Sequence, residues 1–286
     1  MKKVIFILGT SYSGSTMLDM IISNDKLGYS LGEITALFRP YRAHHFDELE
    51  KLKERGDFID IINKGERNLY QNIFIAKPEI EFLVDSSKDV FWVKDNVRRL
   101  KKQGIDVHLI LIHKNIYQIA NSYFKRGILN DWSIAYLEYH RKIFTCLSKE
   151  NIYFLSYNKL IEDKTTLEKL CSHLDIDFFE NKICFWDKKH ETFFGNNRTR
   201  FHTNNEGLGE DKTNMYHASE KRTLRVDIDI PVVVTNTVDK LIRANKNILL
   251  MQEVLNNNIS TDLIKKYSKA YLFLLQHVKP LIIKRK

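Results

Sequence analysis

Residues 3–16 read KVIFILGTSYSGST, and this stretch decides the fold class of the chain. Its first six residues are an apolar, β-branched run of strand length, and residues 17–23 after it follow a helical period. A glycine-containing loop between a strand and a helix can aim successive N–H groups at an anion near the positive end of the helix dipole. We therefore expect a phosphate-binding loop between Gly9 and Thr16.

The loop departs from the nucleotide-binding pattern G-x-x-x-x-G-K-[ST] at one position. Gly9, Gly14 and Thr16 match the pattern, and Ser15 stands where the lysine is expected. ATP and GTP enzymes use that lysine on the β- and γ-phosphates, so its loss argues against ordinary NTP hydrolysis or kinase chemistry. A loop rich in hydroxyls still suits a smaller anion, such as one phosphate carrying a sulfuryl group. The alternative is an ordinary Gly/Ser turn in a Rossmann-like first β-α unit.

Length and composition indicate one globular α/β domain. The chain has 286 residues, and we expect them to form a single domain with a full core. The net charge of +9 suits nucleic acid, an anionic membrane surface or a ligand rich in phosphate or sulfate. The spacing of Cys146, Cys171 and Cys184 suggests neither a disulfide framework nor a zinc site. No stretch approaches the roughly twenty apolar residues of a membrane span, and the first apolar run breaks at Gly9. We expect a soluble, cytoplasmic protein.

Strand and helix patterns alternate along the chain. Further strands are predicted at 80–84, 107–112 and 152–155, and helices at 90–103, 116–126, 132–149 and 159–174. Asp131 is the expected N-cap of the third of these helices. The alternation predicts a P-loop-like parallel sheet of about four or five strands flanked by helices. We expect surface helices within 44–75, a long loop at 188–225, and a helical C-terminal segment at 232–286 whose basic tail could touch a membrane.

Polar residues follow the ends of the predicted strands, where functional groups gather in open α/β sheets. Asp85-Ser86-Ser87-Lys88 follows one strand and Lys114 follows another. Glu33 begins an apolar, helical-looking stretch after Gly32. Glu33 also fits a helix-start acid favoured by the dipole, and Lys88 an ordinary surface lysine.

About 200 residues, from the first loop to the region of Arg200, resemble the sulfotransferases that use 3′-phosphoadenosine 5′-phosphosulfate (PAPS). The likeness is to the bacterial carbohydrate-type and tyrosylprotein-type branches. In that family a loop like Ser11-Tyr12-Ser13-Gly14-Ser15-Thr16 holds the 5′-phosphosulfate, and Tyr12 occupies a position where a basic residue is common. Lys114, Ser122 and Arg126 have the spacing of the family's 3′-phosphate ligands, with Lys replacing the first Arg.

Four further stretches extend the resemblance, and one of them is Asp85-Ser86-Ser87-Lys88. Gly32-Glu33-Ile34 resembles a segment that carries a catalytic Glu in related enzymes, and the residues SYNKL at 156–160 resemble a Y-x-x-L segment. The GNNRTR stretch, with Arg198 and Arg200, resembles the late Gly-Asn-Arg loop. Outside the family pattern, Ser122 and Arg126 fit a solvated helix face, and the two arginines fit a solubilised loop.

The resemblance implies sulfuryl transfer from PAPS to a hydroxyl, with 3′,5′-ADP as the product and no metal. Glu33 is then the base that takes the acceptor proton, and Lys88, or the hydroxyls of Ser15 and Thr16, stabilise the leaving phosphate oxygen. His44, His45 and His190 are alternative bases, although His190 also fits a loop histidine with no role.

The expected acceptor is a carbohydrate or glycoconjugate. The segments around the predicted site mix Arg and Asn with aromatic side chains, namely Phe38, Tyr41, Phe193, Phe194, Phe201 and Tyr216. This mixture suits a sugar, a glycolipid head or a tyrosine side chain, and we expect no nucleic acid partner. Two other functions stay open: a P-loop kinase for a small molecule, and a basic nucleic-acid-binding module.

Overall fold

A parallel sheet forms the centre of the protein. The computed structural model describes residues 1–40, 45–46, 49–50, 63–188, 190, 192, 194, 226 and 229–257. Within them five strands pair in the order β2-β3-β1-β4-β5, and every pairing is parallel. The strands are β1 (Lys3–Leu8), β2 (Gly28–Gly32), β3 (Phe82–Asp85), β4 (Asp106–His113) and β5 (Ile152–Ser156). All carboxyl ends therefore lie along one edge of the sheet.

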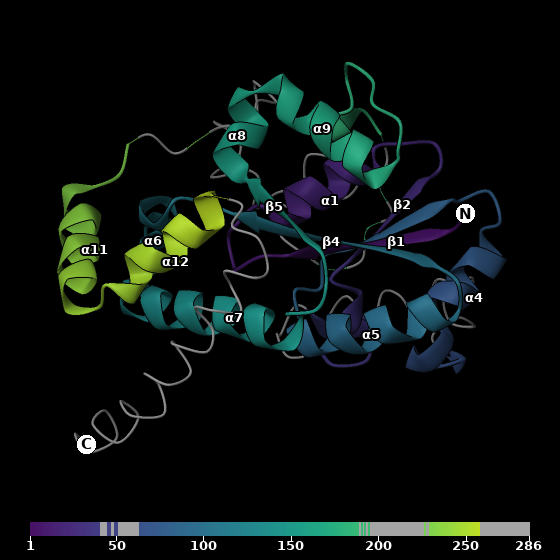
Figure 1. Ribbon diagram of the computed structural model, residues 1–286, viewed down its shortest axis with the longest axis horizontal. Coiled ribbons are helices and arrows are strands. Elements are labelled where there is room, and N and C mark those ends of the chain that lie inside the picture. The colour runs from purple at the N-terminus through teal and green to yellow at the C-terminus, as the bar shows by residue number, and fades with distance from the viewer. Residues whose placement is uncertain are drawn as a thin grey trace.

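Helices cover both faces of this sheet (Figure 1). They are α1 (Ser15–Ser23), α4 (Leu69–Ala76), α5 (Val90–Lys102), α6 (Ile116–Phe124), α7 (Trp132–Cys146), α8 (Tyr157–Glu162), α9 (Lys164–Leu174), α11 (Val232–Ala244) and α12 (Asn247–Asn256). Short 3₁₀ turns occur at Ile34–Leu37, Glu66–Asn68, Leu129–Asp131 and Phe185–Asp187. The predicted fold class, a parallel α/β sheet flanked by helices with a helical segment after it, is confirmed.

The alternation of β1 side chains separates two hydrophobic cores. Val4, Phe6 and Leu8 are fully buried on the face covered by α4, α5 and α7, while Ile5 and Ile7 are fully buried under α1, α8 and α9. Burial of each such side chain contributes roughly 1.5–3 kcal/mol. The central strand is apolar throughout because both of its faces are covered. Its loop at the carboxyl end thus starts from the most buried part of the molecule.

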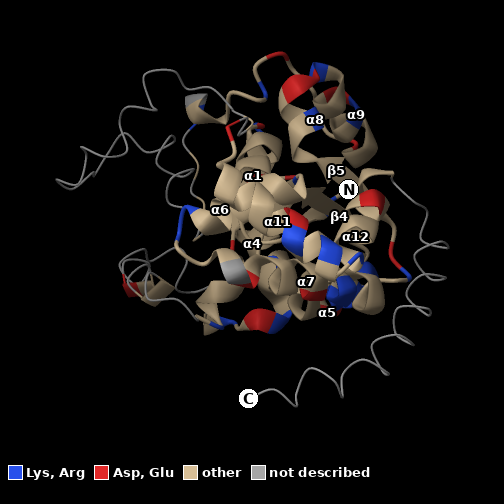
Figure 2. Cartoon of the chain, turned by 90° about the vertical axis from the view of Figure 1, so that its left-hand side faces the viewer, with Lys and Arg blue, Asp and Glu red and all other residues tan. Residues whose placement is uncertain are grey.

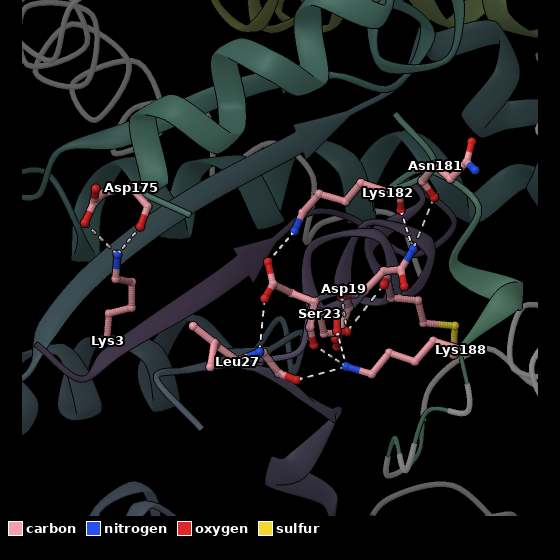
Figure 3. A network of polar contacts seen from close by, with 12 residues as sticks. Lys3, Asp19, Ser23, Leu27, Asp175, Asn181, Lys182 and Lys188 are labelled. Atoms are coloured by element: carbon pink, nitrogen blue, oxygen red, sulfur yellow. Dashed lines mark hydrogen bonds and ion pairs between the residues drawn. The ribbon is translucent and has the colours of Figure 1, made fainter. Parts of the chain in front are cut away.

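Two lysines hold the C-terminal end of α1 (Figure 3). Lys182 Nζ lies 2.8 Å from Asp25 Oδ2, and both side chains are buried. Lys188 Nζ donates to the carbonyl oxygens of Ser23 at 2.9 Å and of Gly28 at 3.3 Å. A cation favours the last carbonyls of a helix. The network anchors α1 at the end opposite its first turn.

Strand β2 was not among the predicted strands, and only the apolar stretch that begins at Glu33 was expected to be helical. It is an edge strand with two glycines, and a Cβ on Gly28 would lie 2.5 Å from the Phe82 ring. Its register against β3 shifts between Ser30 and Gly32, just before Glu33. The apolar stretch after it forms only the short 3₁₀ turn Ile34–Leu37.

Two helix ends also differ from the predictions. Asp131 occupies the N-cap position of α7, as predicted, but its backbone angles are helical (φ −91°, ψ −13°) and its side chain makes no cap hydrogen bond. The single helix predicted at 159–174 is two helices, α8 and α9. The break falls at Asp163, whose extended backbone (φ −129°, ψ 107°) lets its side chain accept from Thr165 N. An aspartate that caps a new helix interrupts the old one.

The helices after residue 231 pack on the α6–α7 side of the molecule. Tyr117 Oη donates to Asp239 Oδ1 at 2.7 Å, which ties α11 to α6. Figure 2 looks onto this side and shows basic and acidic segments mixed over α5, α7, α11 and α12. None of the described helices is long and apolar enough to cross a membrane. The predicted helical segment is thus seen as far as residue 257, and its basic tail lies outside the described residues.

Candidate active site

The carboxyl ends of β1, β2 and β3 open onto one cleft of about 440 Å³. Gly9 and Ser11 of the loop after β1 line it, together with Glu33 after β2 and Lys88 after β3. Because β2, β3 and β1 are consecutive in the sheet, groups far apart in the sequence meet there. The structure therefore brings the predicted catalytic pair to the predicted phosphate loop.

Two glycines of the loop are required by close contacts. Gly14 has a left-handed backbone (φ 98°), and a Cβ there would lie 2.6 Å from the Tyr157 ring. A Cβ on Gly9 would lie 2.4 Å from Ser13 Oγ and 2.8 Å from the carbonyl oxygen of Ile112. Helix α1 starts directly after Gly14, and no side chain caps its first turn. The N–H groups of that turn are the usual donors for a bound anion.

The hydroxyls of the loop differ in their surroundings. Ser13 is fully buried, and its Oγ has no hydrogen-bond partner among the described residues. Ser15 and Thr16 are also buried, whereas Ser11 lines the cleft. An unpaired buried hydroxyl loses roughly 1–3 kcal/mol in desolvation, which a ligand oxygen would restore. The loop thus fits a small anion bound at the first turn of α1.

Glu33 and Lys88 form an ion pair on the wall of the cleft. Lys88 Nζ donates to Glu33 Oε1 at 2.6 Å, with 17% and 4% of the two side chains exposed. Lys88 also has a left-handed backbone (φ 63°), which is uncommon for a residue with a side chain. Backbone strain of this kind persists only where neighbouring groups hold it.

Tyr139 of α7 is the group that holds this backbone. Its Oη accepts from Gly9 N at 3.0 Å and donates to the carbonyl oxygen of Lys88 at 2.9 Å. Burial raises the pKa of the Tyr139 hydroxyl well above its usual value, so it remains a donor at neutral pH. Sequence reasoning missed Tyr139 because an aromatic residue on a helical face reads as core.

Buried carboxylates fix the residues before Lys88. Asp85 accepts from Tyr70 Oη at 2.6 Å and from Trp92 Nε1 at 2.9 Å, and burial raises its pKa. Asp19 of α1 accepts from Ser86 Oγ at 2.7 Å, and burial raises its pKa to about 7. These bonds tie the end of β3 to α1 and α5, and so fix the start of the Ser86-Ser87-Lys88 turn.

Of the three residues predicted to bind a 3′-phosphate, Lys114 follows β4, Ser122 lies on α6 and Arg126 lies just after α6. Arg126 lies over the Tyr12 ring, with its guanidinium carbon 3.9 Å from the centroid. Its Nη1 donates to the carbonyl oxygen of Ser122 at 2.6 Å, and Lys114 Nζ lies 3.6 Å from the Tyr157 ring centroid. Since Tyr12 is in the loop between β1 and α1 and the Tyr157 ring lies against Gly14 of that loop, both cations lie beside it.

Ser122 and two of the alternative bases, His190 and His45, lie within the described residues and contact neighbouring groups. Ser122 Oγ donates to the carbonyl oxygen of Gln118 at 3.0 Å. The ring nitrogens of His190 contact Ser23 Oγ at 3.4 Å and the Phe185 carbonyl at 2.9 Å, and burial lowers its pKa to about 4. His45 is buried beside Phe194, with ring centroids 5.3 Å apart. His190 is thus built into the core.

Several predicted residues lie outside the described part of the chain. They are His44, Arg198, Arg200, Tyr41, Phe193, Phe201 and Tyr216. Among the described residues, no group of three or more His, Cys, Asp and Glu side chains is arranged to hold a metal ion. Sequence reasoning did not single out Arg39 and Lys142, which also line the cleft.

No family model and no curated protein matches the sequence. The solved structures that are similar to the chain include two sulfotransferase domains. One is the sulfotransferase domain from the Synechococcus PCC 7002 olefin synthase, with 13% identity and a TM-score of 0.48, covering 84% of this chain and 96% of that one. The other is the sulfotransferase domain from the curacin biosynthetic pathway, with 15% identity and a TM-score of 0.45, covering 84% and 98%.

Proposed function

We propose that the protein is a sulfotransferase that moves a sulfuryl group from PAPS to a hydroxyl acceptor. The observation that carries this proposal is that a loop without a lysine, at the first turn of α1, and the largely buried Glu33–Lys88 ion pair line the same cleft. The loop supplies anion donors, and the pair supplies a carboxylate that can take a proton. Sulfuryl transfer, like phosphoryl transfer, depends mainly on positioning and electrostatics, and this site supplies both.

The residues present fit PAPS as the donor substrate. The first turn of α1 and the unpaired Ser13 hydroxyl suit its 5′-phosphosulfate. Lys114 and Arg126 beside the loop, together with Ser122, suit its 3′-phosphate, and we assign Arg198 and Arg200 to cofactor binding as well. PAPS brings an activated sulfuryl group to the cleft.

Glu33 is the proposed general base. Its carboxylate is nearly inaccessible, faces the cleft and is 2.6 Å from Lys88 Nζ. Lys88 offsets the carboxylate charge in these buried surroundings and can stabilise negative charge on the leaving oxygen. The acceptor we propose is a carbohydrate or glycoconjugate, with a tyrosine side chain as the alternative, and the basic C-terminal tail could contact a membrane.

Ligand binding tests the donor. We expect 3′,5′-ADP to raise the melting temperature, whereas ATP with magnesium does not, because the loop lacks the lysine that binds β- and γ-phosphates. Stabilisation by ATP and magnesium alone would point to a kinase. Steeply salt-dependent binding of DNA or RNA, without a response to 3′,5′-ADP, would point to a nucleic-acid-binding module.

Replacement of Glu33 tests the base. Glu33→Gln removes the proton acceptor and keeps the shape of the side chain. We expect unchanged 3′,5′-ADP affinity and a turnover lower by about 10²- to 10⁴-fold. Glu168→Gln, an exposed change on α9, is the matched control and should leave turnover unchanged. Near-normal turnover in Glu33→Gln would assign the base to another residue.

A further inference from the structure

We propose that Tyr12, in the loop between β1 and α1, is a positioning residue whose ring holds the Arg126 guanidinium in place for the 3′-phosphate of the donor. This inference rests on the proposed function and adds a residue that acts on the 3′-phosphate through another side chain. The loop itself, residues 9–16, contains no Lys or Arg. A cation that serves the donor at this loop must therefore come from another element and be held against the loop.

Two contacts of different kinds hold Arg126. Its guanidinium carbon lies 3.9 Å from the centroid of the Tyr12 ring. Its Nη1 donates to the carbonyl oxygen of Ser122, in the last turn of α6, at 2.6 Å. The face of an aromatic ring attracts a cation, and a bond to a helix carbonyl fixes one nitrogen of the guanidinium. Together these contacts restrict a side chain that is otherwise exposed to solvent.

The Arg126 guanidinium keeps most of its donors for a ligand. An arginine side chain has five N–H donors. Among the described residues, the guanidinium hydrogen-bonds only the Ser122 carbonyl, and no carboxylate forms an ion pair with it. Its charge thus differs from that of Lys88, which is paired with Glu33. A planar guanidinium of this kind suits the oxygens of a phosphate group.

The Tyr12 ring is itself fixed in position. It packs edge-to-face with Tyr123 of α6, with ring centroids 5.2 Å apart and an angle of 83° between the planes. The backbone of Tyr12 is left-handed (φ 70°), in a turn where Ser13 N donates to the carbonyl oxygen of Thr10 at 3.2 Å. Glycine adopts this conformation without strain, so the contacts of the tyrosine ring must offset the strain. Tyr12 therefore ties the loop to the C-terminal end of α6.

The second cation beside the loop is held in the same way. Lys114 Nζ lies 3.6 Å from the centroid of the Tyr157 ring, and a Cβ on Gly14 would lie 2.6 Å from that ring. Both cations proposed for the 3′-phosphate thus rest on a tyrosine that belongs to the loop or packs against it. Tyr12 is the better position for a test, because it is only partly buried, whereas Tyr157 is buried in the core under α1.

Two nucleotides that differ only in the 3′-phosphate test the proposal. Binding of 3′,5′-ADP and of 5′-AMP is measured by isothermal titration, so neither an acceptor nor turnover is needed. The preference is the ratio of the two dissociation constants. We expect the wild type to prefer 3′,5′-ADP by about tenfold or more, because the 3′-phosphate accepts charged hydrogen bonds. Tyr12→Leu should reduce this preference about three- to fivefold, while the affinity for 5′-AMP changes little.

Further variants separate positioning from a structural role. Tyr12→Phe keeps the ring and should keep most of the preference. Tyr12→Gly removes the ring and suits the left-handed backbone, so it should reduce the preference as Tyr12→Leu does, even if the leucine variant unfolds. In an Arg126→Gln background, Tyr12→Leu should not change the preference further, because the ring acts only through the guanidinium.

Tyr29→Leu is the matched control. Tyr29 is a partly buried tyrosine of β2, and it too has a cation over its ring, with Lys77 Nζ 4.9 Å from the centroid. Its replacement removes a cation–π contact of the same kind at a position outside the loop. We expect the affinities for both nucleotides to be unchanged.

Each contrary result has a distinct meaning. Equal affinity of the wild type for the two nucleotides, or an unchanged preference in Tyr12→Leu and Tyr12→Gly, would overturn the inference. An equal loss of affinity for both nucleotides would also overturn it, because the ring would then act on a part of the donor that both share. A further loss of preference in the Arg126→Gln background would show that Tyr12 does not act through Arg126.

In all these cases the proposed function stands as long as 3′,5′-ADP binds to the wild type. Failure of 3′,5′-ADP to bind would instead remove the proposed function and this inference with it.

Discussion

A single tyrosine joins two parts of the candidate site that are distant in the sequence. Tyr139 Oη bridges Gly9 N and the carbonyl oxygen of Lys88, at 3.0 and 2.9 Å. The left-handed backbone of Lys88 is disfavoured by about 1–3 kcal/mol for a residue with a side chain. The two bonds of Tyr139 offset part of this strain and place the Lys88 side chain against Glu33.

Tyr139→Phe removes a single hydroxyl, but we expect it to lower both stability and catalysis. It removes both bonds and leaves the Gly9 N–H unpaired, so we expect a loss of about 1–3 kcal/mol in stability. The kcat of the proposed transferase reaction should fall about tenfold, because Lys88 is no longer held in position. The KM should change little, because the side chains that bind the acceptor are unchanged. Stopped assays and urea unfolding measure these quantities.

Tyr136→Phe is the matched control for this change. It lies on the same helix, and its buried hydroxyl has no hydrogen-bond partner among the described residues. Removing an unpaired hydroxyl should leave kcat unchanged and stability equal or higher. If Tyr139→Phe and Tyr136→Phe behave alike, Tyr139 does not position the site.

At the scale of elements, the turn into α1 depends on Gly14. Gly14→Ala places a methyl group 2.6 Å from the Tyr157 ring at a left-handed backbone position. We expect more than the roughly 1–2 kcal/mol of destabilisation that left-handed strain alone produces. Binding of 3′,5′-ADP should be lost because the ring and the loop must separate. Isothermal titration and thermal unfolding test both effects.

Gly104→Ala is the control that separates the backbone strain at Gly14 from the steric clash with the Tyr157 ring. Gly104 also has a left-handed backbone (φ 71°), but nothing lies within 4 Å of its added Cβ. This variant should show only the strain and should bind 3′,5′-ADP normally. Equal effects of the two substitutions would mean that the contact with Tyr157 has no consequence for the loop.

The end of β4 and helix α6 carry the proposed 3′-phosphate contacts. Ser122→Ala and Arg126→Ala should each weaken 3′,5′-ADP binding about tenfold or more, since a hydrogen bond to a charged group contributes roughly 1.5–3 kcal/mol. Adenosine 5′-phosphosulfate lacks the 3′-phosphate, and its binding should change little. Lys125→Ala, the adjacent exposed lysine, is the control. Equal losses for the two nucleotides would contradict the assignment.

At the scale of the whole molecule, buried histidines set a dependence of stability on pH. Burial lowers the pKa of His190 to about 4, whereas the unfolded chain has a value near 6.5. Between these values the unfolded state binds more protons, so stability falls as the pH is lowered from 6.5 to 4, by up to roughly 3 kcal/mol from His190. His190→Asn should reduce this slope in urea unfolding measured across that range.

Asp19→Asn should change the slope in the opposite sense. The pKa of Asp19 is raised to about 7, so the native state binds more protons between pH 4 and 7, and stability falls as pH rises. The Asn variant lacks this loss and should gain on the wild type toward neutral pH. If the free energy of unfolding depends on pH in the same way in Asp19→Asn and His190→Asn, burial does not shift the two pKa values in the directions given.

Part of the architecture was predictable from local pattern. The apolar run at residues 3–8 coincides with β1, and the buried run at 107–112 lies within β4. Strand β2 was not predictable in this way, because two glycines and a serine have low strand propensity. That segment pairs because the edge of β3 is beside it and because Gly28 leaves room for the Phe82 ring. The helix break at Asp163 did have a local signal, an aspartate before two threonines.

The sequence by itself determined the parallel α/β sheet and the glycine-containing turn between its first strand and first helix, because strand and helix periods and glycine positions are local properties of the chain. It also indicated Lys88 as a residue after a strand end, and Glu33 as the acid that begins an apolar stretch after Gly32. Only the tertiary structure decided that these two side chains lie 2.6 Å apart, that Tyr139 bridges Gly9 and Lys88, and that Arg39 and Lys142 face the same cleft. Such contacts join segments up to 130 residues apart, and they depend on strand order and helix packing, which no local pattern contains.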